Sequence, residues 1–275
     1  MTEDLRDLLD IEEIDRDIYR ARSFDGVQPG HLYGGQVAAQ ALRAASLTVA
    51  DDRSPHSLHG YFLRAGSSHR PLILQVHRDR DGGSFSARRV LAIQNGEVLF
   101  SGAASFHSNE ESPEYQLPMP PGVARADVEA LGEARGGPTQ FFQILPVPAE
   151  ADDAGVVRSG QMWTRSRVSL PDDDIVHACA LTYVSDFGSG FANVEIEGLA
   201  KGGPSLDHCI WFHLPIRLDD WVFINLWPLR ASGARGTYMG SVHDAEGTLG
   251  CVLTQEALLR PFRPRSARPG DPAEG

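Results

Sequence analysis

The chain has 275 residues, of which 41% are hydrophobic and 23% are charged, a balance typical of one large or two small globular domains. The formal net charge of −12 argues against nonspecific binding to nucleic acid or to an anionic membrane. No apolar run approaches the roughly 20 residues that cross a bilayer, the acidic N-terminus is unlike a signal peptide, and the three cysteines form no CxxC pair. We therefore expect a cytoplasmic protein with no membrane span and no nucleic-acid partner.

The first part of the chain predicts helices followed by antiparallel strands. A short helix begins near Leu5 and leads into a strand over 14–20. The stretch from Gly34 to Val49 is rich in alanine and repeats apolar residues at helical spacing, so we expect a buried helix there. The Asn95–Gly96 pair predicts a hairpin between two of the strands that follow. These strands are expected near 56–64, 71–79, 83–94 and 97–107.

The second part shows the same order of elements after a proline-rich stretch. That stretch predicts a linker with one helix over 123–134. A strand over 156–168 and an apolar, buried helix over 175–184 follow. Further strands are expected near 206–217, 220–230, 235–244 and 248–260. The predicted divisions are an N-terminal unit (1–112), a linker (113–154), a C-terminal unit (155–262) and a disordered tail (263–275).

The two units share landmarks about 150 residues apart. Tyr61–Phe62–Leu63 matches Trp211–Phe212–His213, and each is followed by an apolar run and a glycine turn. The next landmarks, Ala87–Arg88 and Ala234–Arg235, suggest that the two arginines are equivalent. A period of this length indicates duplication of a whole domain rather than a solenoid. Each unit predicts one antiparallel sheet curled around one helix, an α+β fold in which the two sheets could join side by side.

Six short motifs stand out along the chain: Gly34–Val37, His56–Arg64, Gly83–Val90, Tyr183–Asp186, Leu206–His213 and Thr254–Glu256. In content and order they resemble the signatures of the acyl-CoA thioesterase II family. The resemblance runs from about residue 5 to about residue 262, apart from the linker interior. It implies a double hotdog fold, with two antiparallel sheets each curled around a long central helix. It also implies hydrolysis of acyl-CoA thioesters.

In that family an Asp, a hydroxyl residue and a Gln together hold a water molecule. By position these residues are Asp186, Ser205 and Gln255. The hydroxyl residue is more usually threonine; serine keeps the donor and acceptor but lacks the β-methyl group that restricts χ1. Coenzyme A is part of the substrate, so the resemblance implies no added cofactor and no metal.

The residues by themselves leave structural alternatives open. Asp186 follows an apolar helix, where the helix dipole disfavours an anion, so it is either a turn residue or a functional acid. Gln255 lies among apolar residues, and its amide fits a structural hydrogen bond as well as a bound water. Ser205 follows a Gly–Gly–Pro sequence and alone fits a loop serine. A thioester needs no protein nucleophile, because water, a carboxylate and oxyanion donors suffice.

Six further residues are candidates for substrate binding: Gly34, Gly35, His56, His59, Arg88 and Arg235. The two glycines begin the first long helix, whose N–H groups could stabilise an oxyanion. The two histidines either line the pocket or fill the core. The two arginines either face solvent on a strand or bind the phosphates of coenzyme A.

Other catalytic chemistries have less support in the sequence. No GxSxG elbow, P-loop or dinucleotide fingerprint is present. Cys209 fits a buried structural cysteine better than a nucleophile paired with His208, because neighbours in a strand face opposite sides. His208 and His213, with Asp207, match no zinc signature.

Two alternative functions remain. One is a non-catalytic acyl-CoA binding or sensing protein with the same fold. The other is an enoyl-CoA hydratase, which usually needs an Asp and a His in one half, whereas no histidine lies near Asp186 in the sequence. In either case the ligand is an acyl-CoA. Hotdog sheets often pair, so we expect a homodimer or a homotetramer.

Overall fold

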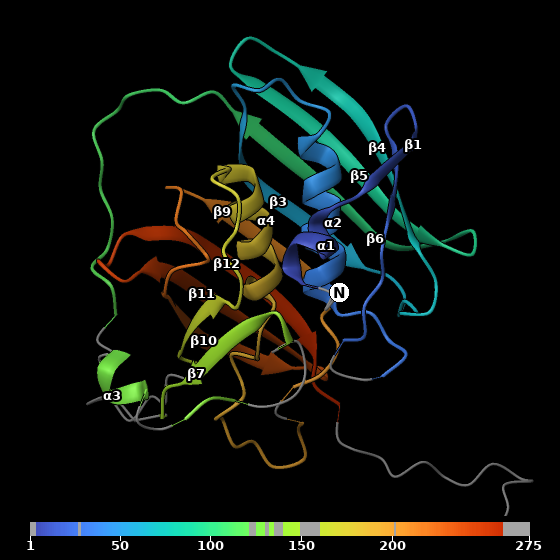
Figure 1. The fold of residues 1–275 in the computed structure, drawn as a ribbon. Helices are drawn as coiled ribbons and strands as arrows, with labels where there is room; N and C mark the ends of the chain where they lie inside the picture. Colours follow the sequence, from blue (N-terminus) through green and yellow to red (C-terminus); the bar gives the residue numbers. More distant parts are fainter. Residues whose placement is uncertain are drawn as a thin grey trace, which may run out of the picture.

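The computed structural model describes residues 4–26, 29–120, 125–129, 132–134, 140–148, 160–200 and 202–260. Over these residues the chain forms one antiparallel sheet of 12 strands, and two long helices cross its inner face (Figure 1). The α+β class expected from the sequence is confirmed. The domain boundaries stay predictions.

The two units contain the same elements in the same order. The first contains β1 (Glu12–Asp15), β2 (Ile18–Ala21), α2 (Gly34–Ser46), β3 (Ser54–Phe62), β4 (Leu72–Asp81), β5 (Phe85–Gln94) and β6 (Glu97–His107). The second contains β7 (Phe142–Pro146), β8 (Met162–Ser166), α4 (Asp174–Ser185), β9 (Asp207–Phe212), β10 (Val222–Ser232), β11 (Arg235–Asp244) and β12 (Leu249–Leu258). The short helices α1 (Leu5–Leu9) and α3 (Arg125–Glu129) precede them.

The strand order is symmetric about its centre. It runs β1-β2-β4-β5-β6-β3-β9-β12-β11-β10-β8-β7. β3 and β9 join the two units by antiparallel pairing from Ser57↔Trp211 to Tyr61↔Asp207. The two sheets expected from the sequence thus join side by side into one continuous sheet. One sheet forms because the pairing of β3 with β9 satisfies backbone groups that two open edges would leave unpaired.

The ladder registers show how the two units correspond. The bulge between β4 and β5 lies at 78–80, and the bulge between β10 and β11 lies at 228–230. A second pair of bulges lies at 92–93 and 242–243. Because a β-bulge marks one defined position in a strand, this repeated spacing of 150 residues aligns the units.

The alignment corrects one inference from the sequence. Arg88 pairs with Ala104, and Tyr238 pairs with Gln255, so Arg88 corresponds to Tyr238 and not to Arg235. The offset of 150 residues holds on both sides of the turn between these strands, so the two hairpins have the same length. The counterpart of Arg235 is Phe85, and the second Ala–Arg pair simply lies three residues earlier in its strand than the first.

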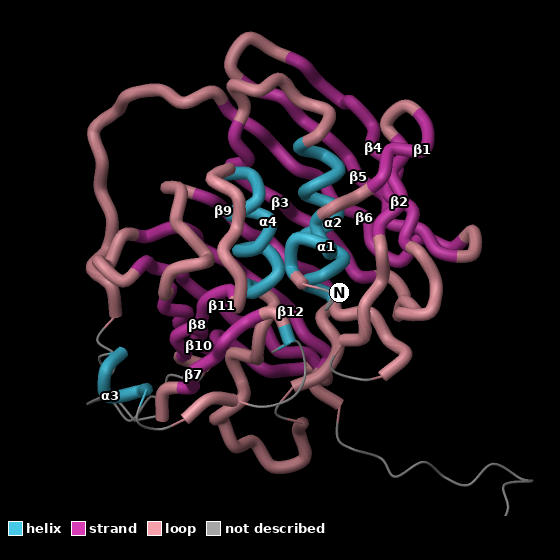
Figure 2. Tube along the Cα trace, in the orientation of Figure 1, coloured by secondary structure: helices cyan, strands magenta, loops and turns pink. Residues whose placement is uncertain are grey.

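The long helices α2 and α4 pack against each other on the inner face of the sheet (Figures 1 and 2). The N-terminus of α2 meets the C-terminus of α4, so the helices are antiparallel. Glycine is required at this contact, because a Cβ on Gly35 would lie only 2.4 Å from the carbonyl oxygen of Tyr183. The small side chains along α2 are buried, as the alanine-rich sequence predicts.

Three other regions refine the expectations from sequence. A hairpin of β1 and β2 replaces the single strand expected over 14–20, because Asp17 adopts a φ of 60° and turns the chain. β7 lies within the range assigned to the linker and pairs with β8 at the sheet edge. The tail predicted over 263–275 lies outside the described residues.

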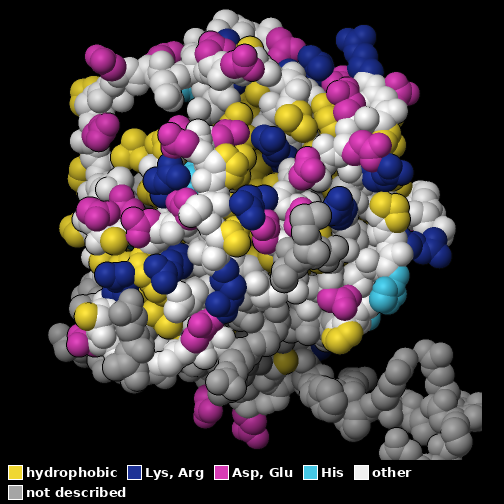
Figure 3. All heavy atoms as spheres, in the orientation of Figure 1, with side chains coloured by type: hydrophobic (Ala, Val, Ile, Leu, Met, Phe, Trp, Pro, Cys, Tyr) yellow, Lys and Arg dark blue, Asp and Glu magenta, His cyan; other side chains and the backbone are white. Residues whose placement is uncertain are grey.

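The face shown in Figure 3 carries basic and acidic side chains mixed together, with hydrophobic side chains between them. On this face the acidic side chains lie among basic ones and do not gather in one patch. Within the described ranges, no helix has the length and apolar character needed to cross a membrane.

Candidate active site

Asp186, Ser205 and Gln255 meet in the C-terminal unit, although they lie far apart in the chain. The Ser205 hydroxyl donates a hydrogen bond to Asp186 Oδ1 at 2.9 Å, and Gln255 Nε2 donates to the same oxygen at 2.8 Å. Gln255 Nε2 also lies 2.5 Å from Ser205 Oγ. The three predicted catalytic side chains therefore form one hydrogen-bonded group, which we call the Asp–Ser–Gln cluster.

Three different elements supply the cluster. Asp186 is the C-cap residue of α4. Ser205 forms an isolated bridge with Ala257, which holds its loop against β12. Gln255 lies in β12, opposite the buried Tyr238 of β11. Asp186 is 7% exposed and Gln255 is 2% exposed, so the polar groups of the cluster depend largely on one another for hydrogen bonds.

The Asp186 carboxylate lies between two helix ends of opposite polarity. The C-terminus of its own helix disfavours an anion, whereas the N-terminus of α2 favours one. A Cβ on Gly34, the first residue of α2, would lie 2.7 Å from Asp186 Oδ2, so the backbone of α2 reaches the carboxylate directly. No side chain caps the N-terminus of α2, and its first turn holds no acid. Among the described residues, none forms an ion pair with Asp186, so the end of α2 supplies compensating positive potential.

Three buried tyrosines surround this carboxylate. Burial raises the pKa of Tyr33, Tyr183 and Tyr238 above the ordinary range, and the nearby charge of Asp186 raises it further. All three phenols therefore stay protonated. The Tyr33 hydroxyl donates to the Tyr183 carbonyl at 3.2 Å and links the start of α2 to the end of α4.

Comparison with known protein families divides the chain into the same two halves. A family model described as acyl-CoA thioesterase N-terminal domain matches residues 24–107, and one described as acyl-CoA thioesterase C-terminal domain matches residues 118–259. The chain belongs to the acyl-CoA thioesterase II family. The resemblance inferred from the six motifs, and with it the double hotdog fold, is confirmed.

Individual relatives align with nearly the whole of this chain. Acyl-coenzyme A thioesterase 8 of Rattus norvegicus is 32% identical over 92% of this chain and 88% of its own length. Acyl-CoA thioesterase 2 of Haemophilus influenzae is 33% identical over 92% of this chain and 96% of its own length. The crystal structure of an acyl-CoA thioesterase II from Mycobacterium marinum is 36% identical, covers 94% of this chain and 98% of its own, and has a TM-score of 0.82. The prediction of a thioester hydrolase is confirmed at the level of the family.

His208 is a member of the same hydrogen-bond network that the sequence did not reveal. Its Nδ1 contacts Gln255 Oε1, and its Nε2 lies 2.7 Å from Ser185 Oγ, one residue before Asp186. Its side chain is 1% exposed. Strand alternation correctly separates His208 from its outward neighbour Cys209. Only the register between β9 and β12, however, brings His208 to Gln255.

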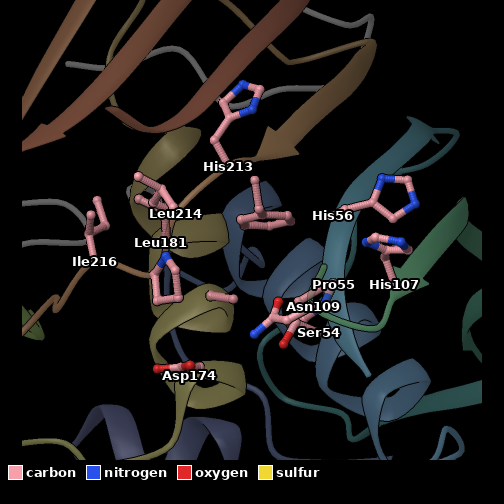
Figure 4. Close-up of a pocket in the computed structure, with 13 residues that line it drawn as sticks. Ser54, Pro55, His56, His107, Asn109, Asp174, Leu181, His213, Leu214 and Ile216 are labelled. Carbon is pink, nitrogen blue, oxygen red and sulfur yellow. The ribbon is translucent and has the colours of Figure 1, made fainter. Parts of the chain in front are cut away.

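The two predicted histidines lie away from the cluster. His56 lines a pocket at the other end of α4, together with Asp174 and His213 (Figure 4). Its Nε2 lies 2.7 Å from Ser105 Oγ. His59 is exposed and packs edge-on against Trp211, with 4.7 Å between ring centroids. The pocket of Figure 4 includes none of the residues of the Asp–Ser–Gln cluster.

The two predicted arginines have different environments. Arg88 is 1% exposed, and its guanidinium donates to the hydroxyl and carbonyl oxygens of Thr48 and to the carboxylate of Asp81. These partners favour a structural role, and we no longer expect Arg88 to bind a phosphate. Arg235 is half-exposed and pairs with Glu256 at 3.0 Å, so it stays a candidate for coenzyme A.

The residues considered for other chemistry do not form a reactive group. Burial, followed by the charge of Asp207, raises the pKa of Cys209 and so disfavours a thiolate. Over the described part of the chain, no group of three His, Cys, Asp or Glu side chains is arranged to hold a metal ion.

Proposed function

We propose that this protein hydrolyses acyl-CoA to a fatty acid and free coenzyme A, using a water held by the Asp–Ser–Gln cluster. The observation that carries the proposal is the convergence of Ser205 Oγ and Gln255 Nε2 on a single oxygen of Asp186. Both hydrogen bonds end on Oδ1, so Oδ2 is the oxygen directed toward the start of α2.

The reaction requires one proton acceptor and no covalent intermediate. A water molecule attacks the thioester carbonyl carbon while Asp186 takes one of its protons, and a C–O bond forms as the carbonyl electrons move to oxygen. Collapse of this oxyanion breaks the C–S bond. The departing sulfur takes the proton from Asp186, which leaves a carboxylic acid, coenzyme A thiol and the original carboxylate.

The first N–H groups of α2 are the proposed donors to the oxyanion. The N–H groups in the first turn of a helix have no intrahelical acceptor and point along the positive end of the dipole. Gly34 is only half-buried and carries no side chain, so it gives a substrate close access to this backbone, whereas Gly35 is packed against α4. The proximity of Gly34 to Asp186 Oδ2 supports donors and base acting on one carbonyl group.

The enoyl-CoA hydratase alternative has weaker support. His208 does enter the network of Asp186, contrary to what the sequence spacing suggested. However, its ring contacts Gln255 and Ser185, and it is buried. It therefore lacks the access to substrate that a hydratase acid or base needs.

The test is thiol release from acyl-CoAs of several chain lengths by the native protein, Asp186→Asn and Asp174→Asn. Asp174 lies at the opposite end of α4 and is the matched control. We expect Asp186→Asn to lower kcat by about 10²–10⁴-fold, the usual range for loss of a general base, and Asp174→Asn to leave it unchanged.

Each alternative gives a different result in the same assay. Acyl-CoA binding without thiol release by the native protein would support a sensor. Loss of the conjugated enoyl thioester without thiol release would support a hydratase. Full turnover by Asp186→Asn would remove the proposed mechanism and leave the family assignment intact. The cytoplasmic location and the homodimer or homotetramer stay predictions, and light scattering of the purified protein would test the latter.

A further inference from the structure

We propose that His208 is a positioning residue that fixes the side-chain amide of Gln255 in its catalytic orientation, with Ser185 as its anchor. This inference rests on the proposed function of the Asp–Ser–Gln cluster. It adds a role for a side chain that does not itself touch the substrate.

The contacts form a continuous chain behind the cluster. Gln255 Oε1 contacts His208 Nδ1, and His208 Nε2 lies 2.7 Å from Ser185 Oγ. Ser185 Oγ also lies 2.9 Å from the carbonyl oxygen of Thr182 on the preceding turn of α4. His208 is therefore held from one side by a helix and holds the amide on the other.

The hydrogen-bond chemistry fixes the direction of the amide. Gln255 Nε2 must face Asp186, because an amide oxygen there would meet a carboxylate oxygen. Gln255 Oε1 then faces His208 Nδ1, which must carry a hydrogen to make the bond. The serine hydroxyl can satisfy Nε2 either as donor or as acceptor. Rotation of the amide by 180° would break both of its contacts at once, so His208 opposes that rotation.

The first unit provides an internal comparison without this chemistry. The β3–β9 ladder makes Leu58 the counterpart of His208, and the β6 and β12 ladders make Ala104 the counterpart of Gln255. Leu58 is 0% exposed and Ala104 is 2% exposed. The fold thus accepts an aliphatic pair at these positions. Of these two equivalent positions, only the one beside a buried amide carries an imidazole.

The experiment compares His208→Leu, which copies the first unit, with His208→Asn, which keeps a donor near the position of Nδ1. We expect His208→Leu to lower kcat about 10–100-fold with little change in KM, because a loosened water-binding group affects the transition state more than binding. His208→Asn should recover most of the lost kcat. Ser185→Ala should give a smaller loss, since it acts through His208.

Double variants separate positioning from a general structural effect. In a Gln255→Ala background the amide is absent, so adding His208→Leu should cause no further loss of kcat. A further loss in that background would show that His208 acts on something other than Gln255. Full kcat in folded His208→Leu would also overturn the inference.

The outcome does not depend on His208→Leu folding well. If that variant unfolds, a His208→Asn enzyme with no kcat, or a Ser185→Ala enzyme with native kcat and native pH profile, counts against positioning. Failure of the proposed function looks different, because Asp186→Asn would then keep full turnover whatever His208 does. The NMR resonance of the imidazole Nδ1–H is a measurement that does not depend on catalysis. We expect it to shift or broaden in Gln255→Ala.

Discussion

The C-terminal ends of the two long helices occupy equivalent places in the duplicated fold, yet they carry opposite chemistry. The α4 end holds a buried polar group: Asp186, Ser205, His208, Tyr238 and Gln255. At the α2 end, the helix cap and the ladder registers give the counterparts Leu47, Pro55, Leu58, Arg88 and Ala104. Four of these five are apolar, so the polar cluster is a property of one end and not of the fold.

The charge at each helix end shows how the two ends differ in their effect on stability. At the α2 end the Arg88 guanidinium donates 2.9 Å hydrogen bonds to Thr48 O, one residue beyond the helix C-cap, and to Arg80 O in β4, which places a cation beside the end of the helix. A cation there is stabilising, whereas the end of α4 disfavours the Asp186 anion, which the N-terminus of α2 compensates only in part. One helix end therefore carries a favourable charge, and the other carries an acid that departs from this rule.

The pocket of Figure 4 lies at the α2 end and not at the Asp–Ser–Gln cluster. Pro55, the counterpart of Ser205, lines the pocket of Figure 4 with Phe212, the counterpart of Phe62. Phe62 itself lies near Gly34 at the start of α2. The pocket at the α2 end is itself partly polar, because His56, Asp174 and His213 are in its lining.

The largest effect is expected from removing the cation of the α2 end. Arg88→Met leaves the carbonyls of Thr48 and Arg80 without their donor, and we expect a loss of about 3 kcal/mol in the free energy of unfolding. The matched control is Arg89→Met, because Arg89 is exposed and forms a surface ion pair with Asp79 at 3.3 Å. Urea denaturation measures both. A loss in Arg89→Met equal to that in Arg88→Met would contradict the contrast between the helix ends.

Gln255→Ala copies the α2 end at the catalytic position. It removes one donor to Asp186 and leaves His208 without its partner, so we expect kcat to fall about 100-fold, or about 2.7 kcal/mol in the barrier. Thr254→Ala, one residue away on the outer face of β12, is the control and should keep native kcat. Steady-state thiol release distinguishes them. Native activity in Gln255→Ala would mean that the cluster does not hold the reacting water.

Asp186→Asn should raise stability while it removes activity. The neutral amide keeps an acceptor for Ser205 and Gln255 but removes a buried charge from the end of α4, so we expect a gain of about 1 kcal/mol. Asp81→Asn is the control at the α2 end. Its hydrogen bond with Arg88 lowers the pKa of Asp81, so its charge is favourable and its removal should give no gain. Thermal unfolding of the two variants tests this opposite sign.

The smallest effect is expected on the pH dependence of stability and comes from His177 of α4. The corresponding region of α2 is lined by alanine side chains. Burial is the main cause that lowers the pKa of His177 below its ordinary value of 6.5. The unfolded chain then binds a proton first as pH falls, so stability is present above pH 6.5 and declines below it toward the folded pKa. His177→Asn keeps an acceptor for the Leu218 N–H and should flatten part of this decline. Unfolding midpoints between pH 7.5 and 5.5 measure the slope, and an unchanged slope in the variant would exclude His177 as a source.

The sequence predicted the elements well where periodicity or turn residues were strong. The strand over 97–107 and the strand over 235–244 have the predicted bounds, and both long helices were placed within three residues. β7 was missed because prolines surround a short edge strand. Such a strand has little pattern of its own, and its pairing with β8 is a tertiary contact.

The candidate site depended on the family resemblance and on strand register in different ways. The motifs alone pointed to Asp186, Ser205 and Gln255. His208 could not be connected to Gln255 without the β9–β12 register, which periodicity along one strand does not contain. The same limitation made Arg88 and Arg235 look equivalent, because an Ala–Arg pair occurs in both strands at positions that only the ladder registers distinguish.

The joining of two similar units in one polypeptide has a consequence for how such a site can change. In a symmetric assembly of identical chains, every substitution occurs at both equivalent positions. A substitution that inactivates one site therefore inactivates the equivalent site as well. Here the pairing of β3 with β9 gives the same symmetric arrangement within one polypeptide. Each half can therefore accept mutations that its partner never carries, so one half can keep a polar cluster while the other keeps apolar side chains at the equivalent positions.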